Sequence, residues 1–586
     1  MPRSGQSWVY AACFVIALAA TAFADSAATQ SVDYVPAGPP SWAADAIWYQ
    51  VFVSRFANGE PGNDPVGTLP WDTDWAKRRP DEDKPLGIHL HFRRYGGDLL
   101  GLRQKLPYLI DLGVNALYLN PVFQADSEHK YDTADYRHID DSFGVADSRL
   151  ALADETEDPK TWGWSASDRE FLALLANAHA RGLRVIIDVP FNHVGQSFWA
   201  WQDVKKHGQE SAYSAWFDVL NWGPPLRWNA WDGPNGNLVR FRRSGDGLHP
   251  DVEQHIFAIT RRWMDPDGDG DPSDGIDGWR LDAAEQVPHG FWRRFRRVVK
   301  SVNPEAFILG EIWVNHAPWL DGEQFDACTN YPFSWAVVDF VRGNAGDATT
   351  AFADQFDRLS RREPLSAILA MADLLDSHDT ERIATMLLGE GVLSDATTDD
   401  PNRRDLLRPD NTAYRHQRLA AFVQFTAPGA PMVFYGDEVG MYGGDDPFCR
   451  APMWWPESAA EGYRADLHSS YRFLCHARQR LPALRRGAFR LVMADNARQL
   501  VAFCRWTKDQ VVFVLVNGDE HTHVAELNIG AGSQIVSILR GASDLDGDPV
   551  PPPAVGPDGL VSIECSGLSG ALIIVRPALE RLSATE

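Results

Sequence analysis

Short apolar runs alternate with amphipathic, helix-like stretches over most of the chain. Helical periodicity follows several of the runs, as at 169–181 and 290–300. The expected strands are Ile47–Phe52, Ala116–Val122, Arg184–Val189, Asp277–Asp282, Phe307–Ile312, Phe325–Asn330, Leu374–Asp379 and Pro431–Tyr435. Strands that alternate with helices form a parallel sheet covered on both faces, and eight such repeats predict a closed (β/α)8 TIM barrel.

The pattern changes at two places, and these changes divide the chain. Residues 192–251, after the third expected strand, are rich in Trp, Gly, Asn and Pro. A connection of this length needs its own structure, so we expect a small inserted domain there. From residue 486 to 586, short alternating strands at 500–506, 511–517 and 571–575 predict a C-terminal antiparallel β-sandwich. The barrel therefore occupies 45–191 and 252–485.

The N-terminus has the pattern of an export signal. Arg3 precedes an apolar run from Val9 to Ala22, and Ala22-Phe23-Ala24 has the small residues that precede a cleavage site. We expect residues 1–24 to be a signal peptide, residues 25–44 to be a flexible leader, and the mature protein to be secreted or periplasmic. The alternative is an uncleaved anchor, although the run is short for a membrane span.

Composition limits the class of partner. The chain has 80 acidic and 55 basic residues, a net charge of −25, which repels phosphate backbones and anionic lipids. We therefore expect no nucleic acid partner and no membrane partner after signal cleavage, whereas a neutral substrate is unaffected. The 22 tryptophans suit stacking on sugar rings, although most are expected to fill the core. The cysteines after the signal show no spacing typical of zinc sites.

Four expected strands end in polar or charged residues that would be costly inside a core. These segments are Asp188-Val-Pro-Phe-Asn-His193, Gly278-Trp-Arg-Leu-Asp282, Leu309-Gly-Glu311-Ile and Asp376-Ser-His-Asp379. Each alone is most simply a capping or surface acid at a turn. Together, at the carboxyl ends of barrel strands, they predict one cleft that holds carboxylates, an arginine and two histidines.

This set of side chains fits glycoside cleavage with retention of configuration. That reaction needs two carboxyl groups about 5 Å apart, one as nucleophile and one as acid and then base. We expect Asp282 to be the nucleophile, with Arg280 on the same strand face to keep it ionised, and Glu311 to be the acid/base. Hydrogen bonds to the sugar hydroxyls are expected from His193, His378 and Asp379.

The four segments resemble the four signature regions of the α-amylase family of glycoside hydrolases, in the order of that family. The resemblance extends from about Ala46 to Trp455 and implies a retaining hydrolase of α-glucosidic bonds. It gives the three catalytic roles to Asp282 as nucleophile, Glu311 as acid/base and Asp379 as transition-state stabiliser. It implies that the substrate is lined by Tyr131, which would stack under the sugar, by His193, Arg280 and His378, and by Asp446 and Arg450, which would close its far side.

Within the family, the chain most resembles the cyclomaltodextrinase, neopullulanase and maltogenic amylase group. The segment from Ala43 to Phe52, followed by Arg-Phe-Ala-Asn-Gly, is similar to the start of the barrel in that group. So are Gly310-Glu-Ile-Trp, Gln324-Phe-Asp-Ala and Asn330-Tyr-Pro-Phe. The resemblance implies hydrolysis of α-1,4 bonds in maltooligosaccharides, cyclodextrins, pullulan or starch, each a neutral α-glucan.

Three features depart from that group. Its N-terminal β-sandwich, which shapes a dimer, has no counterpart before the barrel, so we expect a monomer or weak oligomer. The fifth conserved region of the group is present only as Gly245-Asp-Gly-Leu-His249. Val314 replaces the usual His after Glu-Ile-Trp, at a position that bears on acceptor subsites.

Two loops bear on metal binding, because calcium prefers oxygen ligands at short spacing. The first resembles the calcium loop of the same group, and its expected ligands for a structural Ca²⁺ are Asn58, Glu60, Asn63, Asp64, Gly96 and Asp98. The alternative is a solvated Asn/Asp/Gly turn. In the second loop, Asp265 to Asp271, the spacing of the aspartates suits calcium. However, Ile276 occupies the position where an EF-hand loop has Glu. We expect a solvated loop there, and no organic cofactor.

Two other functions stay open. A transglycosylase or isomerase forms the same covalent intermediate but lets a sugar attack it instead of water. A non-catalytic glucan-binding protein of this fold would be expected to have lost a catalytic carboxylate, whereas Asp282, Glu311 and Asp379 are all present.

Overall fold

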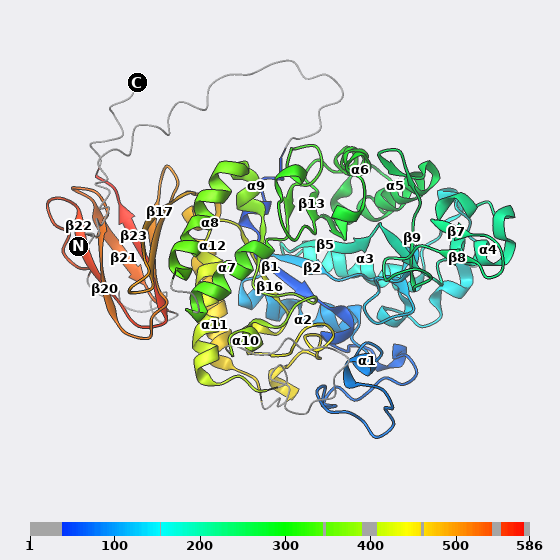
Figure 1. Ribbon diagram of the computed structural model, residues 1–586, viewed down its shortest axis with the longest axis horizontal. Helices are drawn as coiled ribbons and strands as arrows, with labels where there is room; N and C mark the ends of the chain where they lie inside the picture. Colours follow the sequence, from blue (N-terminus) through cyan, green and yellow to red (C-terminus); the bar gives the residue numbers. More distant parts are fainter. Residues whose placement is uncertain are drawn as a thin grey trace, which may run out of the picture.

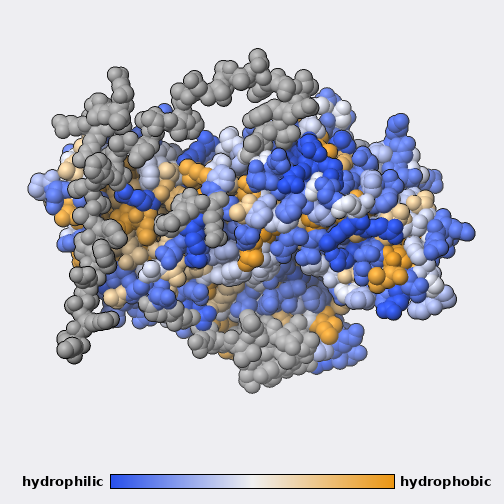
Figure 2. All heavy atoms as spheres, turned by 45° about the horizontal axis from the view of Figure 1, so that its top comes forward, coloured by the Kyte–Doolittle hydropathy of each residue, from blue (hydrophilic) through white to orange (hydrophobic). Residues whose placement is uncertain are grey.

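The computed structural model describes residues 38–152, 154–343, 347–388, 407–458, 462–541 and 552–578. The expected signal peptide and most of the expected leader lie outside these ranges. Within them, no helix combines the length and the apolar character needed to cross a membrane. On the face shown in Figure 2, hydrophilic residues predominate and hydrophobic ones form small patches.

A parallel eight-stranded sheet forms the centre of the molecule, in the order β14-β13-β12-β5-β2-β1-β16-β15 (Figure 1). The strands are β1 (Trp48–Val51), β2 (Ala116–Leu119), β5 (Arg184–Pro190), β12 (Gly278–Asp282), β13 (Phe307–Gly310), β14 (Ala327–Cys328), β15 (Ala372–Leu374) and β16 (Ala430–Phe434). The barrel closes between its end strands, where Asn330 N donates to Ala372 O at 2.9 Å. The predicted (β/α)8 barrel is confirmed.

Helices surround the sheet, which explains why its strands are apolar on both faces. The longer ones are α2 (Leu99–Leu112), α3 (Ala166–His179), α5 (Pro250–Met264), α6 (His289–Val302), α7 (Tyr331–Arg342), α8 (Ala348–Arg362), α11 (Asn411–Thr426) and α12 (Ala465–Arg480). The shorter ones are α1 (Leu86–Leu90), α4 (Trp199–His207), α9 (Leu365–Ala370), α10 (Ile383–Met386) and α13 (Pro482–Arg486). Local signals fix their starts: Ser165 and Asp168 form a capping box at α3.

The seventh strand differs from its prediction. We expected Leu374–Asp379, but β15 covers Ala372–Leu374, so the polar segment lies in the loop that follows it. In that loop Asp376 Oδ2 accepts a hydrogen bond from Ile383 N at 2.5 Å, and Ser377 N donates to Thr380 Oγ1 at 2.9 Å. These side chains offer the backbone an alternative to the ladder, which is why the strand ends early.

Small antiparallel pairs follow β5, where the inserted domain was expected. They join β6 (His193–Gly195) with β9 (Leu238–Arg240), β7 (Val219–Asn221) with β8 (Arg227–Trp228), and β10 (Arg243–Ser244) with β11 (Gly247–Leu248). A further pair, β3 (Phe123–Ala125) and β4 (Thr133–Ile139), precedes α3. In Figure 1, β7, β8 and α4 lie at the end of the molecule opposite the C-terminal strands.

The C-terminal strands form a five-stranded antiparallel sheet, β17-β18-β19-β23-β21, and a two-stranded one, β20-β22. Their bounds are β17 (Ala488–Asp495), β18 (Leu500–Trp506), β19 (Val511–Asn517), β20 (His523–Asn528), β21 (Gln534–Leu539), β22 (Leu560–Cys565) and β23 (Ser569–Arg576). Side chains of both sheets share one apolar core, as in a sandwich. The predicted antiparallel C-terminal sheet is confirmed. Buried Arg505 ties it to the barrel helices through Thr426 O at 3.0 Å.

All five cysteines of the described residues are buried free thiols: Cys328, Cys449, Cys475, Cys504 and Cys565. Burial raises the pKa of each of these thiols above its ordinary value. Thiols of this kind are inert, because the thiolate is the reactive form.

Candidate active site

Charged side chains from neighbouring strands meet at the carboxyl end of the barrel. Asp188 lies on β5, Arg280 and Asp282 lie on β12, and Glu311 follows β13 directly. The parallel register sets Arg280 beside Asp188. Asp379 reaches the same place from the loop after β15. The strand ends predicted from the sequence therefore do converge.

Arg280 is the centre of this cluster and is only 1% exposed. Its Nη1 donates to Asp188 Oδ1 and Oδ2 at 2.9 Å and to Asp282 Oδ1 at 3.0 Å. Its Nη2 lies 3.1 Å from Glu311 Oε1. Because Asp282 and Glu311 contact one guanidinium group, their carboxylates are neighbours at the same end of the barrel.

Glu311 is held by two further hydrogen bonds. Its Oε2 accepts from the backbone N–H of Ala283 at 2.7 Å, and its Oε1 accepts from Trp313 Nε1 at 3.1 Å. Ala283 adopts the left-handed backbone conformation, with φ at 45°, which a residue with a side chain seldom does. The strain aims the N–H after Asp282 at Glu311.

The charges of the cluster act on one another. Burial raises the pKa of Asp282 well above its ordinary value, the charge of Glu311 raises it further, and Arg280 opposes both. Burial and the charge of Glu311 also raise the pKa of Asp379 to about 7, against the opposing charges of Arg450 and Arg280. A group of carboxylates this close together retains a proton near neutral pH.

Tyr131 and His378 form one wall of the cleft. The two rings are nearly parallel, with centroids 5.4 Å apart and an interplanar angle of 8°. Tyr131 Oη donates to Asp188 Oδ2 at 2.7 Å and lies 2.5 Å from His378 Nε2. His378 Nε2 is also 3.2 Å from Asp379 Oδ2, so this wall joins the carboxylate cluster.

The tautomer of His378 follows from its other neighbour. Gln50 Nε2, an amide donor, lies 2.9 Å from His378 Nδ1 and also donates to Asn120 Oδ1 at 3.1 Å. His378 Nδ1 therefore accepts, and the proton is on Nε2, which faces the cleft. Burial lowers the pKa of His378 well below its ordinary value, so the ring is neutral.

Asp446 and Arg450 lie beside Asp379. Arg450 Nη1 contacts Asp446 Oδ1 at 2.8 Å, and its Nη2 contacts Asp379 Oδ1 at 3.3 Å. Its Nε donates to the backbone oxygen of His378 at 2.8 Å. The loop after β16 is thus tied to the loop after β15, on the side of the cleft that carries Tyr131.

His193 lies at the start of the insertion, on β6. Its ring is nearly parallel to that of Trp231, with centroids 6.2 Å apart, and its Nδ1 lies 3.3 Å from Asn192 Nδ2. Its Nε2 is buried and has no hydrogen-bond partner among the described residues. Burial lowers the pKa of His193 to about 4, so a neutral imidazole is available to a ligand.

Comparison with known protein families matches residues 50–160 and 166–481 to the alpha amylase catalytic domain. The matched ranges contain the whole cleft described above. The chain belongs to the α-amylase family.

Relatives within this family are similar over most of the chain. A cyclomaltodextrinase of a Bacillus species is 37% identical over 489 residues, which is 83% of this chain and 75% of the relative. Neopullulanase 2 of Thermoactinomyces vulgaris is 37% identical over 510 residues, 86% of this chain and 74% of the relative. The solved structure of the cyclic α-maltosyl-(1→6)-maltose hydrolase of Arthrobacter globiformis, in complex with cyclic α-maltosyl-(1→6)-maltose, has a TM-score of 0.68 at 29% identity and covers 92% of this chain and 100% of that one.

Three residues of this α-amylase family cleft were not among the sequence candidates. Asp188 was noted only as a polar strand end, yet it binds both Arg280 and Tyr131. Gln50 was hidden inside an apolar run, although an uncharged polar residue in a buried strand is itself a signal. Trp313, which donates to Glu311, gives no signal that distinguishes it from a core tryptophan.

The raised pKa of Asp379 predicts how stability changes with pH. Unfolded, this carboxyl titrates near 3.8, and folded near 7, so folding takes up a proton between these values. The contribution of Asp379 to stability is therefore lost as pH rises from about 4 to 7. Asp379→Asn should be more stable than the parent by roughly 2 kcal/mol at pH 8, a value discounted for the 28% exposure of the side chain.

Denaturant unfolding of both proteins at pH 4, 6 and 8 measures this difference. We expect it to be near zero at pH 4 and to grow with pH. A difference that is the same at all three pH values would contradict the assignment.

The expected calcium loop brings several oxygens together. Asn58 Nδ2 donates to Asp64 Oδ1 at 2.9 Å, and Asn63 Nδ2 donates to Gly144 O at 2.7 Å. The Oδ1 atoms of Asn58 and Asn63 are buried and lack a hydrogen-bond partner among the described residues. A Cβ at Gly96 would lie 2.1 Å from Asp64 Oδ1, so only glycine fits there. Unsatisfied amide oxygens beside a carboxylate suit a hard cation.

The other two expected ligands of this loop are engaged elsewhere. The carboxylate of Asp98 accepts hydrogen bonds from the backbone N–H groups of Gly59, Glu60 and Gly101, and it caps α2. The carboxylate of Glu60 accepts from Gly62 N at 3.0 Å, in an exposed turn. The fit to calcium therefore depends on Asn58, Asn63 and Asp64.

The second acidic loop places carboxylate oxygens of Asp265, Asp267 and Asp274 within 4.8 Å of one another. Both oxygens of Asp265 accept from backbone N–H groups, those of Gly268 and Gly270, at 3.1 Å. Asp267 and Asp274 are exposed or half-buried. These contacts suit the solvated loop expected from the sequence.

Proposed function

We propose that the protein is a retaining α-glucan hydrolase in which Asp282 is the nucleophile and Glu311 the acid/base. The observation that carries the proposal is the shared contact of both carboxylates with Arg280, at 3.0 and 3.1 Å. Membership of the α-amylase family supports it, since its relatives include a cyclomaltodextrinase and a neopullulanase.

The first half of the reaction breaks the glucosidic bond. Glu311 gives its proton to the glucosidic oxygen while Asp282 attacks the anomeric carbon, so the leaving sugar departs with a new hydroxyl and the donor sugar becomes esterified to Asp282. In the second half, Glu311 takes a proton from water, and the oxygen of that water displaces Asp282. Two inversions restore the α configuration.

The rest of the cluster prepares this step. The proposed reaction needs a proton on Glu311 before the bond is cleaved. Arg280 Nη1, which donates to both Asp188 and Asp282, stabilises the charged form of the nucleophile. Tyr131 would stack under the donor sugar, and the Nε2–H of His378, which contacts Tyr131 Oη and Asp379, holds these two side chains in position. Asp379, held by Arg450, accepts from hydroxyls near the reacting carbon.

Initial rates on β-cyclodextrin, pullulan and soluble starch test the proposal and rank the substrates. We expect hydrolysis of at least one of them, with the α anomer as the first product seen by proton NMR. The β anomer would rule out the retaining assignment. Loss of hydrolysis products in favour of longer oligosaccharides when an acceptor sugar is added would instead identify a transglycosylase.

We propose that the loop around Asn58, Asn63 and Asp64 binds a structural Ca²⁺. The buried, unsatisfied amide oxygens and the close fit of Gly96 support this proposal. When bound, the ion would neutralise Asp64 and fix the loop between β1 and α2. None of these residues contacts the carboxylate cluster, so the ion takes no part in the chemistry.

Chelation should therefore lower the melting temperature more than it lowers substrate affinity. We expect a decrease of roughly 3–6 °C in EDTA, reversed by calcium, since a ligand bound only to the folded state stabilises it. Asp64→Asn should remove this response, whereas the matched variant Asp265→Asn, in the other acidic loop, should keep it. An unchanged melting curve in EDTA would exclude the ion.

We propose that the chain is exported, as a monomer or weak oligomer, to the periplasm or the medium. The apolar segment before Ala24 and the absence of a spanning helix among the described residues support this proposal. N-terminal sequencing of the exported protein should start at Asp25, and sedimentation should give the mass of one chain. A mature protein that still begins at the apolar run would indicate an anchor.

A further inference from the structure

Three aromatic rings, those of Trp313, Tyr331 and Trp335, form a row from Glu311 to the surface, and we call this row the file. Trp313 donates to Glu311, and its ring stacks on that of Tyr331, with centroids 3.9 Å apart and planes 3° apart. The ring of Tyr331 lies 6.4 Å from that of Trp335. Tyr331 is buried and Trp313 is half-buried, whereas Trp335 is 45% exposed.

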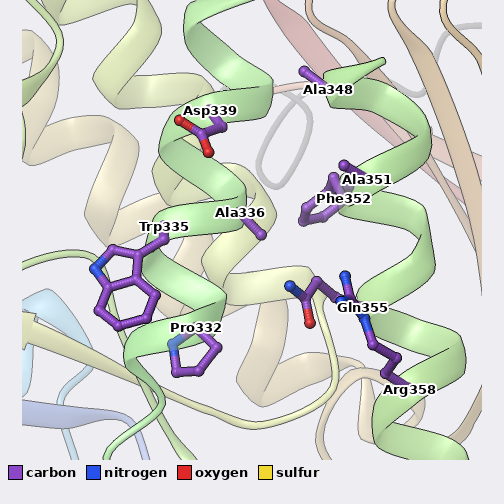
Figure 3. Close-up of a pocket in the computed structure, with 9 residues that line it drawn as sticks. All are labelled: Pro332, Trp335, Ala336, Asp339, Ala348, Ala351, Phe352, Gln355 and Arg358. Carbon is purple, nitrogen blue, oxygen red and sulfur yellow. The ribbon is translucent and has the colours of Figure 1, made fainter. Parts of the chain in front are cut away.

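Helix geometry sets the outer part of this file. Tyr331, Trp335 and Asp339 are four residues apart on α7 and therefore share one face of the helix. Figure 3 shows Trp335 and Asp339 on the same side of α7. Neither side chain takes part in a hydrogen bond or ion pair with another described residue. An indole face and a free carboxylate are thus presented together to solvent.

The file lies on the leaving-group side of the cleft. Glu311 protonates the oxygen that joins the donor sugar to the leaving sugar, so groups attached beside Glu311 face that junction. The donor side is already bounded by Tyr131 and by Arg450, with Asp446 behind it. Trp313 lies beside that junction, and the buried ring of Tyr331 connects it to Trp335 at the surface of α7.

A small pocket of about 150 Å³ extends the surface beside Trp335. It lies between α7 and α8, and Figure 3 shows Ala336, Gln355 and Arg358 around it. Amide and guanidinium groups can hydrogen-bond to sugar hydroxyls, which the indole face alone does not recognise. The surface around Trp335 therefore combines the apolar face of the indole with polar groups at its edge, as carbohydrate sites do.

We propose that Trp335 and Asp339 form a remote subsite that holds the leaving-group end of a long α-glucan, a few glucose units beyond the bond that is cut. The proposal rests on the proposed function, because it gives a binding position to one end of the α-glucan substrate. A buried tryptophan would only fill the core, but a half-exposed one with a solvent-facing carboxylate beside it is suited to stacking under a pyranose ring.

Substrate length provides the test. In Trp335→Ala, the ratio of kcat/KM for soluble starch to that for maltotriose should fall about threefold to tenfold. Trp335→Phe keeps an aromatic face and should retain most of the ratio, and Asp339→Ala should lower it less than Trp335→Ala does. Leu365→Ala is the matched control, because Leu365 is apolar, 44% exposed and outside the file, and it should leave the ratio unchanged.

Each outcome bears on one claim. An unchanged ratio in Trp335→Ala, or an equal loss on both substrates, overturns the remote subsite and leaves the proposed hydrolase intact. If the unmodified protein hydrolyses neither substrate, the proposed function fails. Calorimetric binding of maltoheptaose to the unmodified and Trp335→Ala proteins then decides the subsite alone: weaker binding in the variant supports it, and equal binding overturns it.

Discussion

Asp282→Gly should lower kcat on α-glucans by about 10⁴- to 10⁶-fold, the largest effect that we expect from any single substitution. The side chain supplies the new bond to the anomeric carbon. Asp188, the other carboxylate on Arg280 Nη1, cannot replace it, because it is fully buried and already accepts a hydrogen bond from Tyr131. Steady-state rates on soluble starch measure the loss, at enzyme concentrations high enough to detect the remaining activity.

Added azide separates a missing nucleophile from a misfolded protein. In Asp282→Gly the space left by the side chain admits azide, which attacks once from that face. The product from an activated aryl α-maltoside should then be the β-azide, formed with one inversion. Recovery of the α-azide, or no recovery in a variant with an unchanged melting temperature, would contradict the role of Asp282.

Glu311→Gln should lower kcat by about 10²- to 10⁴-fold while glucan binding survives. The amide keeps the size of the side chain, and its single oxygen can still accept from Trp313 and Arg280, so only the hydrogen bond from Ala283 N is lost. It cannot donate a proton at the glucosidic oxygen or accept one from water. Rates on starch and calorimetric binding of maltoheptaose measure the two effects separately.

The leaving group supplies the control for this second variant. An aryl α-maltoside with an acidic phenol needs little protonation, so its first step should be far less affected than that of starch. Azide should restore turnover and give the α-azide, since Asp282 still forms the intermediate. A loss of binding together with activity would show that Glu311 has a structural role.

The barrel was predictable because its strands are buried on both faces and are therefore continuous apolar runs. The strand predicted at Asp277–Asp282 covers Gly278–Asp282, so its end lies at the expected residue. The seventh strand ends before its expected residue, because the side chains of Asp376 and Thr380 accept hydrogen bonds from the backbone N–H groups of Ile383 and Ser377 and draw the segment out of the sheet. Local competition of this kind is not visible in hydrophobicity.

Residues of the candidate site could be predicted from the sequence at positions where the residue type has only one plausible role. A carboxylate at the end of an apolar strand is such a case, and Asp282 and Glu311 do meet. Gln50 and Trp313 are not, because a strand glutamine and a loop tryptophan have many uses. Asp98, an expected calcium ligand, shows that an acid at the start of a helix can also serve as a cap, because its carboxylate caps α2.

The backbone N–H of Ala283 donates to Glu311, and Ala283 directly follows Asp282. This backbone hydrogen bond therefore fixes the distance between the two reacting carboxyl groups and acts as a spacer between them. Changes in neighbouring side chains can retune affinity without altering that distance. Glycine at 283 would keep the spacer, whereas a β-branched residue, which resists the left-handed turn, would be expected to move acid and nucleophile apart.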